Sequence, residues 1–482
     1  MPLSSTDRPL EAGPILYARG ADAHAARIGV VVVTRSGDPA PLIGAGDDMP
    51  AAMTHRAALF GHDVWGAELV LPASERAVYG VNGREYALRT DLTGDLAVAF
   101  VSCNGQEEGD EDRTHEDRDV MWRRLAAEHR ERPFALLLQG GDQLYADEAV
   151  KAHPDAARWQ GLPLEERPSV AWTAEMEEAV RGYFFRRYLQ AFRQPAMREL
   201  SAGVPTLMIW DDHDIFDGWG SHPPALQESP VARGLFAAAR EMFVLFQLGG
   251  SPDALPETCP DRTGASFTQG AGFPGFSVLL PDLRSERTPT RVMGDTGWAA
   301  FEAMLGAVPA GDRQIVVSSV PALGPRLSLI ESLLDFYPGQ QQYEDDLRDQ
   351  WQSRAHRAEW VRFLSALERE AIETGAVTVV SGEIHLATRA EMRLRDGSVL
   401  HQLVASGITH PKPPRAMAVG LGLLSRLGHA PLRGRPVRLK ALPGQKATYT
   451  AERNFLVLER SGTSWTARWN LEESGTTAPL PL

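Results

Sequence analysis

Cysteine is scarce in this sequence, and long apolar runs are missing. Only Cys103 and Cys259 occur among 482 residues, so no disulfide framework is predicted. No stretch approaches the roughly 20 apolar residues of a membrane span, and no transmembrane segment is expected. The residues from Met1 to Arg8 contain neither an apolar segment nor a twin arginine. We therefore expect a cytoplasmic protein.

Positive charge is the second shortage. The chain has 49 Lys and Arg against 63 Asp and Glu, a formal net charge of -14. Nucleic-acid binding depends on cations that neutralise phosphates, so no stable nucleic-acid binding is expected. A phosphate ester held locally by a metal ion and a few arginines is still compatible with this balance. No Gly-x-Ser-x-Gly nucleophile elbow and no P-loop occurs, and no residue pattern sets an oligomeric state.

Residues 1–95 predict a small N-terminal β-sandwich domain. The β-branched run 28–34 indicates a strand, and the runs 77–81 and 84–88 flank Asn82-Gly83. That dipeptide between two such runs is the strongest short-range signal for a hairpin. The region carries no cluster of chemical groups, so its expected role is packing or a lid.

Residues 96–482 predict an α/β catalytic domain with largely parallel central strands, because buried-strand runs alternate with helical periods. Strands are expected at 96–101, 134–139, 204–209, 277–280, 314–320 and 376–380, and helices at 117–130, 174–200, 231–247 and 354–374. The closing strands of residues 436–482 are expected at about 435–439, 447–453, 455–459 and 465–469. The Gly/Pro-rich stretch 407–435 has little periodicity and is expected to be a loop near the site.

The stretch after the predicted strand 204–209 carries the densest chemistry. Between Asp211 and Asp217 it holds four carboxylates and one imidazole, and Gly218 closes it. In open α/β sheets, ligands bind just beyond the carboxyl ends of such strands. So many like charges are costly unless a cation lies among them. A solvated acidic turn is the alternative interpretation of this stretch alone.

Three other predicted strands lead into similar residues. They end at Ser102-Cys103-Asn104, Gly141-Asp142-Gln143-Leu144-Tyr145 and Gly382-Glu383-Ile384-His385. Four such strand ends in one chain are a more specific signal than a single acidic turn. Carboxylate, imidazole, phenolate and thiolate together suit a mixed pair of metal ions, one softer or more oxidised and one harder. Two such ions can hold a phosphoryl group, lower the pKa of water and stabilise a leaving oxygen.

These motifs resemble those of the alkaline phosphatase D (PhoD-like) family of calcineurin-type metallophosphoesterases. The matching stretches are Ser102-Cys103, Gly141 to Tyr145, Trp210 to Asp214 and Ser381 to His385. A β-sandwich ahead of the catalytic domain also fits. The resemblance implies an α/β fold in which a four-layer metallophosphoesterase-type β-sandwich is flanked by helices.

The same resemblance implies two metal sites that share one carboxylate. Asp142 is expected to bridge the ions, and Cys103, Tyr145 and His385 are expected to complete an iron(III) site. In the alternative interpretation, Tyr145 only packs beside the site and Cys103 is a small buried hydrophobe.

The second ion, often calcium in this family, is expected to bind Asp212, Asp217 and Glu383, and manganese or zinc are the other candidate metals. Glu383 stands where the family usually has Asp, which places its carboxylate further from the backbone.

By the same resemblance, His213 takes the place of the superfamily's catalytic histidine. It is expected to donate a proton to the leaving group or to stabilise charge on the phosphoryl oxygens. Asp142 and His213 are thus the expected catalytic residues. Asp211 and Asp214 are expected to orient His213 or its neighbours.

The substrate phosphate needs cations besides the metal ions. Candidates for this contact are Arg389, His410 and Arg284, together with Lys412, Arg415 and Arg287. A surface salt bridge is the alternative for each residue taken singly.

The expected function is hydrolysis of phosphomonoesters or phosphodiesters by attack of a metal-bound hydroxide at a binuclear site. The closest enzymatic alternative is a phospholipase D-like lipid phosphodiesterase. The alternative from another class is a non-catalytic scaffold that retains the fold.

Overall fold

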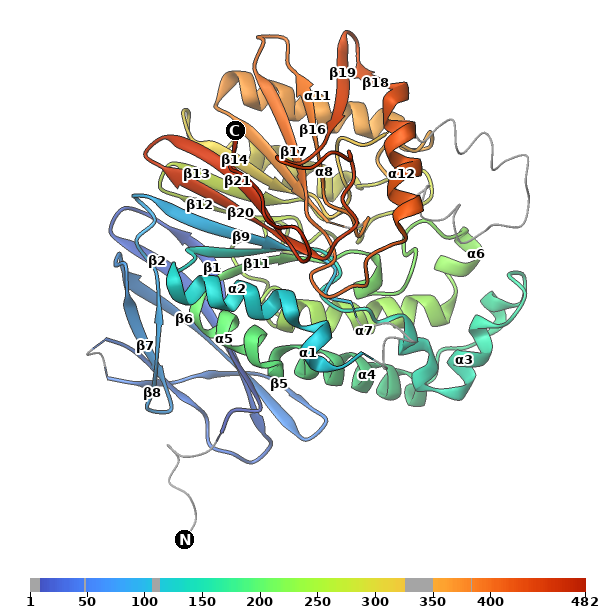
Figure 1. Ribbon diagram of the computed structural model, residues 1–482. Helices are drawn as coiled ribbons and strands as arrows, with labels where there is room; N and C mark the ends of the chain where they lie inside the picture. Colours follow the sequence, from blue (N-terminus) through green and yellow to red (C-terminus); the bar gives the residue numbers. More distant parts are fainter. Residues whose placement is uncertain (1–8, 47–48, 106–112, 326–349, 383) are drawn as a thin grey trace.

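The computed structural model describes residues 9–46, 49–105, 113–325, 350–382 and 384–482. Two large β-sheets lie face to face, and helices cover both outer sides (Figure 1). The predicted helix 354–374 is present as α11 (Arg357–Glu373), and the predicted helix 231–247 as α7 (Pro230–Phe246).

The first sheet has the strand order β22-β21-β20-β9-β10-β11-β1-β2-β6-β5, with β23 paired to β21. Its central strands β9 (Leu96–Val101), β10 (Leu136–Gly140) and β11 (Thr206–Ile209) are parallel and buried throughout, as is typical of strands covered on both faces. The other strands are β1 (Ala12–Ala21), β2 (Ala25–Arg35), β5 (Thr54–Leu59), β6 (His62–Pro72), β20 (Asn454–Ser461), β21 (Ser464–Leu471), β22 (Gly475–Thr476) and β23 (Leu480–Pro481).

The second sheet has the order β12-β13-β14-β15-β17-β16-β19-β18. The strands β13, β14, β15 and β17 are parallel, and antiparallel strands complete both edges. The bounds are β12 (Gln269–Phe273), β13 (Phe276–Leu280), β14 (Arg313–Val317), β15 (Val377–Ser381), β16 (Thr388–Arg393), β17 (Val399–Val404), β18 (His429–Leu432) and β19 (Arg435–Lys440).

The parallel strands β13, β14, β15 and β17 of the second sheet each contribute side chains to two apolar cores. Val317 and Val380 belong to the core between the sheets, together with Phe100 of β9. Their chain neighbours Val316 and Val379 belong to a second core, together with α11. Successive side chains of a strand point to opposite faces, so buried runs of this kind need a layer on each side.

Helices supply those outer layers. In Figure 1, α2, α4, α5 and α7 lie along the first sheet, and α8 and α11 lie along the second. The bounds not yet given are α1 (His115–Arg118), α2 (Val120–Glu131), α3 (Pro154–Gln160), α4 (Ala174–Arg193), α5 (Pro195–Gly203), α6 (Pro224–Gln227), α8 (Asp295–Leu305) and α12 (Arg415–Leu424), with 3-10 turns η2 (Asp147–Ala152), η3 (Arg167–Ser169), η4 (Asp212–Asp214) and η5 (Ser425–Leu427). The order helix, sheet, sheet, helix confirms the predicted four-layer α/β arrangement.

The N-terminal strands form the predicted sandwich, but one of its sheets is shared. A small sheet of β4 (Ala51–Ala52), β3 (Leu42–Ala45), β7 (Ala77–Val81) and β8 (Arg84–Leu88) packs on β1 and β2 around a separate apolar core. The predicted hairpin is present, and Asn82 and Gly83 both have positive φ, of 50° and 79°. However, β1 also pairs in parallel with β11, so the first sheet continues into the catalytic region. The division at residue 95 stays a prediction.

The predicted single helix 174–200 is wrong, because α4 ends at Arg193 and α5 begins at Pro195. Between them Gln194 has an extended backbone (φ -58°, ψ 128°). A residue before proline is kept out of the helical region by the proline ring. The break lets α5 contact β1 and β8 separately from α4.

Two predictions for the last quarter of the chain also fail. The stretch 407–435, expected to be a loop, contains α12 and β18, because the unbroken apolar residues of α12 show no polar–apolar period. The expected strand 447–453 is only a bridge in which Thr450 pairs with Ala387.

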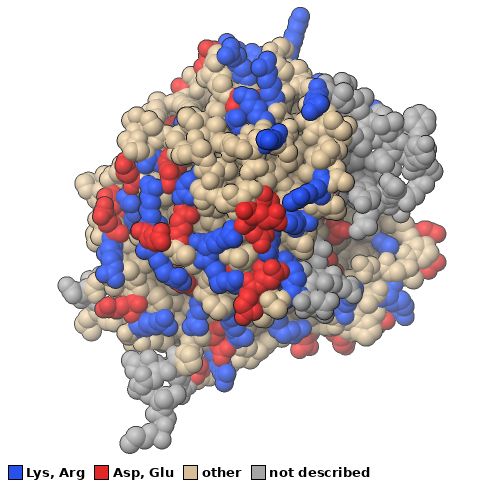
Figure 2. Space-filling view, in the orientation of Figure 1, with Lys and Arg blue, Asp and Glu red and all other residues tan. Residues whose placement is uncertain are grey.

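The charged side chains are unevenly spread over the face seen in Figure 2. Acidic and basic residues are interspersed over its lower half. At its top, where Figure 1 shows β16, β18 and β19, most of the charged side chains are Lys or Arg.

Candidate metal centre

The two sheets bring their strand ends together at one edge. The segment after β9 runs beside the segment after β10, since the amides of Cys103 and Asn104 donate to the carbonyls of Gly141 and Asp142 (3.1 and 2.8 Å). The second sheet approaches closely at Gly382, where a Cβ atom would lie 2.1 Å from Ser102 Oγ. Only glycine permits this approach, so Gly382 lets the segment carrying His385 reach the other strand ends.

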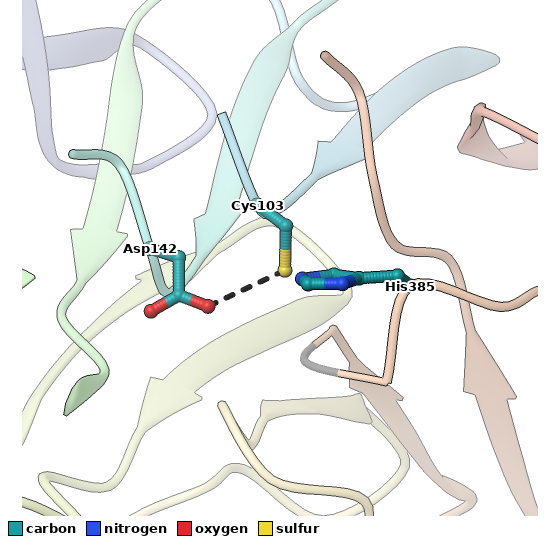
Figure 3. A group of neighbouring side chains, drawn as sticks. All are labelled: Cys103, Asp142 and His385. Carbon is teal, nitrogen blue, oxygen red and sulfur yellow. Dashed lines mark hydrogen bonds between the residues drawn. The ribbon is translucent and has the colours of Figure 1, made fainter. Parts of the chain in front are cut away.

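The first group of candidate ligands contains Cys103, Asp142 and His385. Their ligand atoms all lie within 4.8 Å of one another, and the Cys103 thiol donates to Asp142 Oδ2 at 3.4 Å (Figure 3). Each comes from a different strand end, as predicted. Tyr145 is adjacent, because its hydroxyl lies 2.7 Å from His385 Nε2 and its ring stacks on His213 at 4.4 Å.

All three residues of this group have a left-handed backbone. Their φ values are 55°, 54° and 53°, and Gly141 before Asp142 has φ 106°. Such a conformation costs an L-residue about 1–3 kcal/mol and persists only where the surroundings impose it. Strain at three neighbouring positions indicates that the fold holds these side chains for a function.

Two further groups of candidate ligands adjoin the first. One contains Asp142, Asp211 and Asp212, and the other contains Asp212, His213 and Asp217. Asp142 belongs to the first and second groups, and Asp212 to the second and third, so the three groups form one continuous set. Asp142 is therefore placed where a carboxylate could bridge two cations.

The carboxylate of Asp142 fits a cation on two counts. It is 1% exposed, and its Oδ1 atom has no hydrogen-bond partner among the described residues. Burial and the carboxylates of Asp211 and Asp212 raise the pKa of Asp142 well above its ordinary value, although His213 opposes this. A buried acceptor without a donor is costly, and a cation would relieve that cost.

Arg284 is a buried arginine that forms ion pairs with two of the acidic residues. Its side chain is fully buried, its Nε donates to Asp211 Oδ1, and its Nη2 lies 3.3 Å from Asp212 Oδ1. Such an arginine has no surface left for substrate. The prediction that Arg284 binds the substrate is therefore wrong, and Arg284 instead positions the carboxylates.

His213 is oriented by a residue that the sequence interpretation missed. Its Nδ1 lies 3.0 Å from both carboxylate oxygens of Asp147, which also accepts a hydrogen bond from the Asp217 amide (2.7 Å). Although burial by itself lowers the pKa of His213, Asp147 and Asp212 raise it well above its usual value. Since Nδ1 is occupied by Asp147, Nε2 is the nitrogen that a reacting group could reach.

Asp211 and Asp214 contact neighbours of His213, and their role as orienting residues stays a prediction. Asp211 accepts from Ser319 Oγ at 2.9 Å. Asp214 accepts from the amides of Asp211 and Leu144 (3.0 and 2.9 Å) and so joins the segments after β11 and β10. Burial raises the pKa of Asp214 to about 7.

The remaining predicted residues lie in different surroundings. His410 stacks on His385 with ring centroids 3.4 Å apart, which places it at the centre. Arg389 lies on β16, where it pairs with Glu391 at 2.7 Å and donates to the Ala441 carbonyl, and these contacts match the salt-bridge alternative. Lys412 and Arg415 both pair with Glu473. Glu383 lies outside the described residues.

We expect Asp147→Asn to slow turnover without removing metal. A neutral amide holds an imidazolium less well, so kcat should fall about 10- to 100-fold. Since Asp147 raises the pKa of His213, its loss should also move the alkaline limb of the pH profile to lower pH. Steady-state kinetics and metal analysis check this result.

The control for that experiment is Glu148→Gln, because Glu148 is the next residue and accepts a hydrogen bond from Tyr183 of α4. An Asp147→Asn enzyme with the kcat and pH profile of the Glu148→Gln enzyme would contradict the role given to Asp147.

The structure thus places groups of candidate metal ligands at the carboxyl ends of strands in a four-layer α/β fold, where ligands of such sheets bind. The chain belongs to the family of PhoD-related phosphatases. The model of that family matches residues 101–342, which are half of the chain. The solved structure of PhoD has the same fold, with a TM-score of 0.58 and 12% identity over 97% of this chain and 88% of that chain.

An uncharacterized protein of Saccharomyces cerevisiae is 23% identical over 425 residues, which cover 70% of this chain and 60% of the yeast protein. The present chain thus spans about 60% of the length of that relative. In the part of the chain that the structure describes, no helix is long and apolar enough to cross a membrane.

Proposed function

We propose that this chain hydrolyses phosphate esters at a pair of metal ions that share Asp142. The observation that carries the proposal is that Asp142 belongs to two adjoining groups of candidate ligands. Membership of the phosphatase family supports a phosphate ester as substrate. Two bound cations would supply a nucleophile from water near neutral pH and would offset the charge of the phosphoryl oxygens.

The donor sets suit two different ions. Cys103, His385 and the adjacent Tyr145 offer soft and anionic donors, which favour iron(III) over magnesium or calcium. Asp212 and Asp217 offer carboxylate oxygens, which favour calcium or manganese. Asp142 would bind to both ions.

The side chains around the ligands supply the remaining chemistry. His213 is held by Asp147 through Nδ1, and its raised pKa favours the protonated ring that a general acid needs. We assign His213 to the proton that the departing alcohol requires. Arg284 keeps Asp211 and Asp212 in place, and His410 covers the His385 ring.

Parallel assays of an aryl phosphomonoester and an aryl phosphodiester, with metal content measured per chain, test the proposal. Two metal ions per chain and metal-dependent hydrolysis of at least one ester are expected. A chain that holds no metal and hydrolyses neither ester would be a non-catalytic scaffold, the alternative that the sequence left open.

Iron in the first group should give the purified protein a visible colour. Thiolate and phenolate donors transfer charge to a ferric ion in the visible range, and the charge of the metal keeps both donors deprotonated. The absorption maximum should shift in Tyr145→Phe and in Cys103→Ser. Colourless, fully active protein that contains only zinc or calcium would reject iron and leave the hydrolase proposal standing.

A further inference from the structure

The segment 397–451 differs in charge from the rest of the protein. It contains no Asp or Glu, and its cations are Lys412, Arg415, Arg426, Arg433, Arg435, Arg438, Lys440 and Lys446. With these eight removed from the total of 49, the remainder has 41 Lys and Arg against 63 Asp and Glu. A basic segment in so acidic a chain points to an anionic partner.

Several of these cations are on the surface without an acidic partner. Arg426 and Arg433 are exposed, and neither forms an ion pair with a carboxylate of the described residues. Figure 2 shows the basic side chains at the top of the view, where β18 and β19 lie. Four of the eight cations pair with carboxylates, namely Lys412, Arg415, Arg435 and Lys440. The charge of Arg426 and Arg433 is presented to solvent.

Helix α12, within the same segment, presents apolar side chains to solvent. From Ala416 to Leu424 it has no polar residue, a composition that normally belongs to a buried helix. Yet Met417, Val419 and Leu423 are 45%, 61% and 56% exposed. These are three of the eight exposed large hydrophobic side chains found in the described chain, and they lie on one ten-residue helix.

The inner side of α12 packs against a residue next to the candidate metal centre. Ala418 and Leu421 pack with Leu386 and Tyr449 in a small apolar cluster. Leu386 follows His385, the candidate ligand on which His410 stacks. Whatever binds to the outer side of α12 is thereby brought next to the strand ends that carry the ligands.

We propose that α12 and the exposed cations of the segment 397–451 dock this protein on an anionic lipid bilayer. Stable attachment to a membrane surface usually takes two signals, and here exposed aliphatic side chains adjoin a basic surface. Nucleic acid would be attracted by the cations but offers no apolar phase for Val419 and Leu423. An anionic bilayer offers both, since its head groups attract the cations and its hydrocarbon layer accommodates the aliphatic side chains.

Vesicle sedimentation tests the proposal with the full chain. The protein should bind vesicles of phosphatidylcholine mixed with phosphatidylserine and leave those of phosphatidylcholine alone largely unbound. Binding should weaken as salt is raised, because the attraction to the lipid head groups is screened. Equal binding to both vesicles, or to neither, would overturn the proposal.

Two pairs of variants separate the apolar and the basic contributions. The double variant Val419→Ser with Leu423→Ser should bind the anionic vesicles about tenfold more weakly, since buried methylene groups are lost. Arg426→Gln and Arg433→Gln should each weaken binding about fivefold. The matched controls are Val70→Ser on β6, where Val70 is 67% exposed, and the single variants Arg76→Gln, just before β7, and Arg84→Gln on β8.

Hydrolysis of a soluble aryl phosphodiester should be unchanged in all of these variants, since none of the substituted residues lies in the candidate ligand groups. Failure of docking and failure of the proposed hydrolysis are therefore separate results. If the wild-type protein instead binds a duplex DNA probe more tightly than anionic vesicles, the surface is a nucleic-acid site and the bilayer proposal is wrong.

Discussion

Asp142→Asn should lose metal and turnover together. The substitution removes the one charge that two adjoining groups of candidate ligands share, so both ions should be held more weakly. We expect fewer than two ions per chain and a fall in kcat of about 1000-fold, the loss of several kcal/mol of transition-state stabilisation. Metal analysis of dialysed protein and single-substrate kinetics check the result.

The stability of the metal-free protein gives a second, independent readout. In the absence of cations, Asp142 is a buried carboxylate beside Asp211 and Asp212, which raise its pKa. A folded-state pKa above the unfolded value means that the ionised carboxylate opposes folding at neutral pH. The neutral amide should therefore raise the melting temperature of the metal-free protein while lowering that of the metal-loaded protein.

Asp396→Asn is the control, because Asp396 lies exposed in a turn where it accepts from Ser398. Asp142→Asn protein that keeps two ions and near-normal turnover would show that Asp142 does not bridge.

His213→Asn should keep its metal and lose about 100-fold or more in kcat. The imidazole of His213 is not part of the first group of candidate ligands, and Asp212 and Asp217 remain in the third when it is removed. The loss should depend on the leaving group. An alkyl phosphate needs the proton far more than an aryl phosphate does, so the alkyl ester should suffer the larger fall.

His55→Asn serves as the control, since His55 lies on β5 at the edge of the first sheet and pairs with Asp63. The alternative role for His213 is that of a metal ligand, because His213 belongs to a group that could hold a metal ion. Loss of metal in His213→Asn, with equal effects on alkyl and aryl esters, would make His213 a ligand instead of an acid.

The sequence was sufficient to predict the strand ends, because two properties coincide there. Each buried run is long enough to mark a strand, and each is followed closely by a residue of a type that can bind metal, as at Cys103 and Asp142. The parallel arrangement of β9, β10 and β11 then brings those residues to one edge. This part of the site could be predicted because each strand and its candidate ligand are adjacent in the sequence.

The residues that support the site could not be predicted in the same way. Asp147 meets His213 across 66 residues, and Arg284 meets Asp211 across 73, so no spacing in the sequence connects them. Arg284 follows a strand and resembles any cation that could contact phosphate. Only its complete burial shows that its task is to hold carboxylates. By contrast, the break at Gln194 had a local signal, the proline that follows it.

The left-handed backbone at Cys103, Asp142 and His385 has a consequence for how this protein tolerates change. Glycine or asparagine adopts this conformation at lower cost. Random substitution screened for thermal stability alone should therefore enrich variants that replace these candidate ligands. We therefore expect activity and thermal stability to favour different residues at these three positions. A search for stabilising substitutions should leave these positions unchanged and vary residues of the outer helices instead.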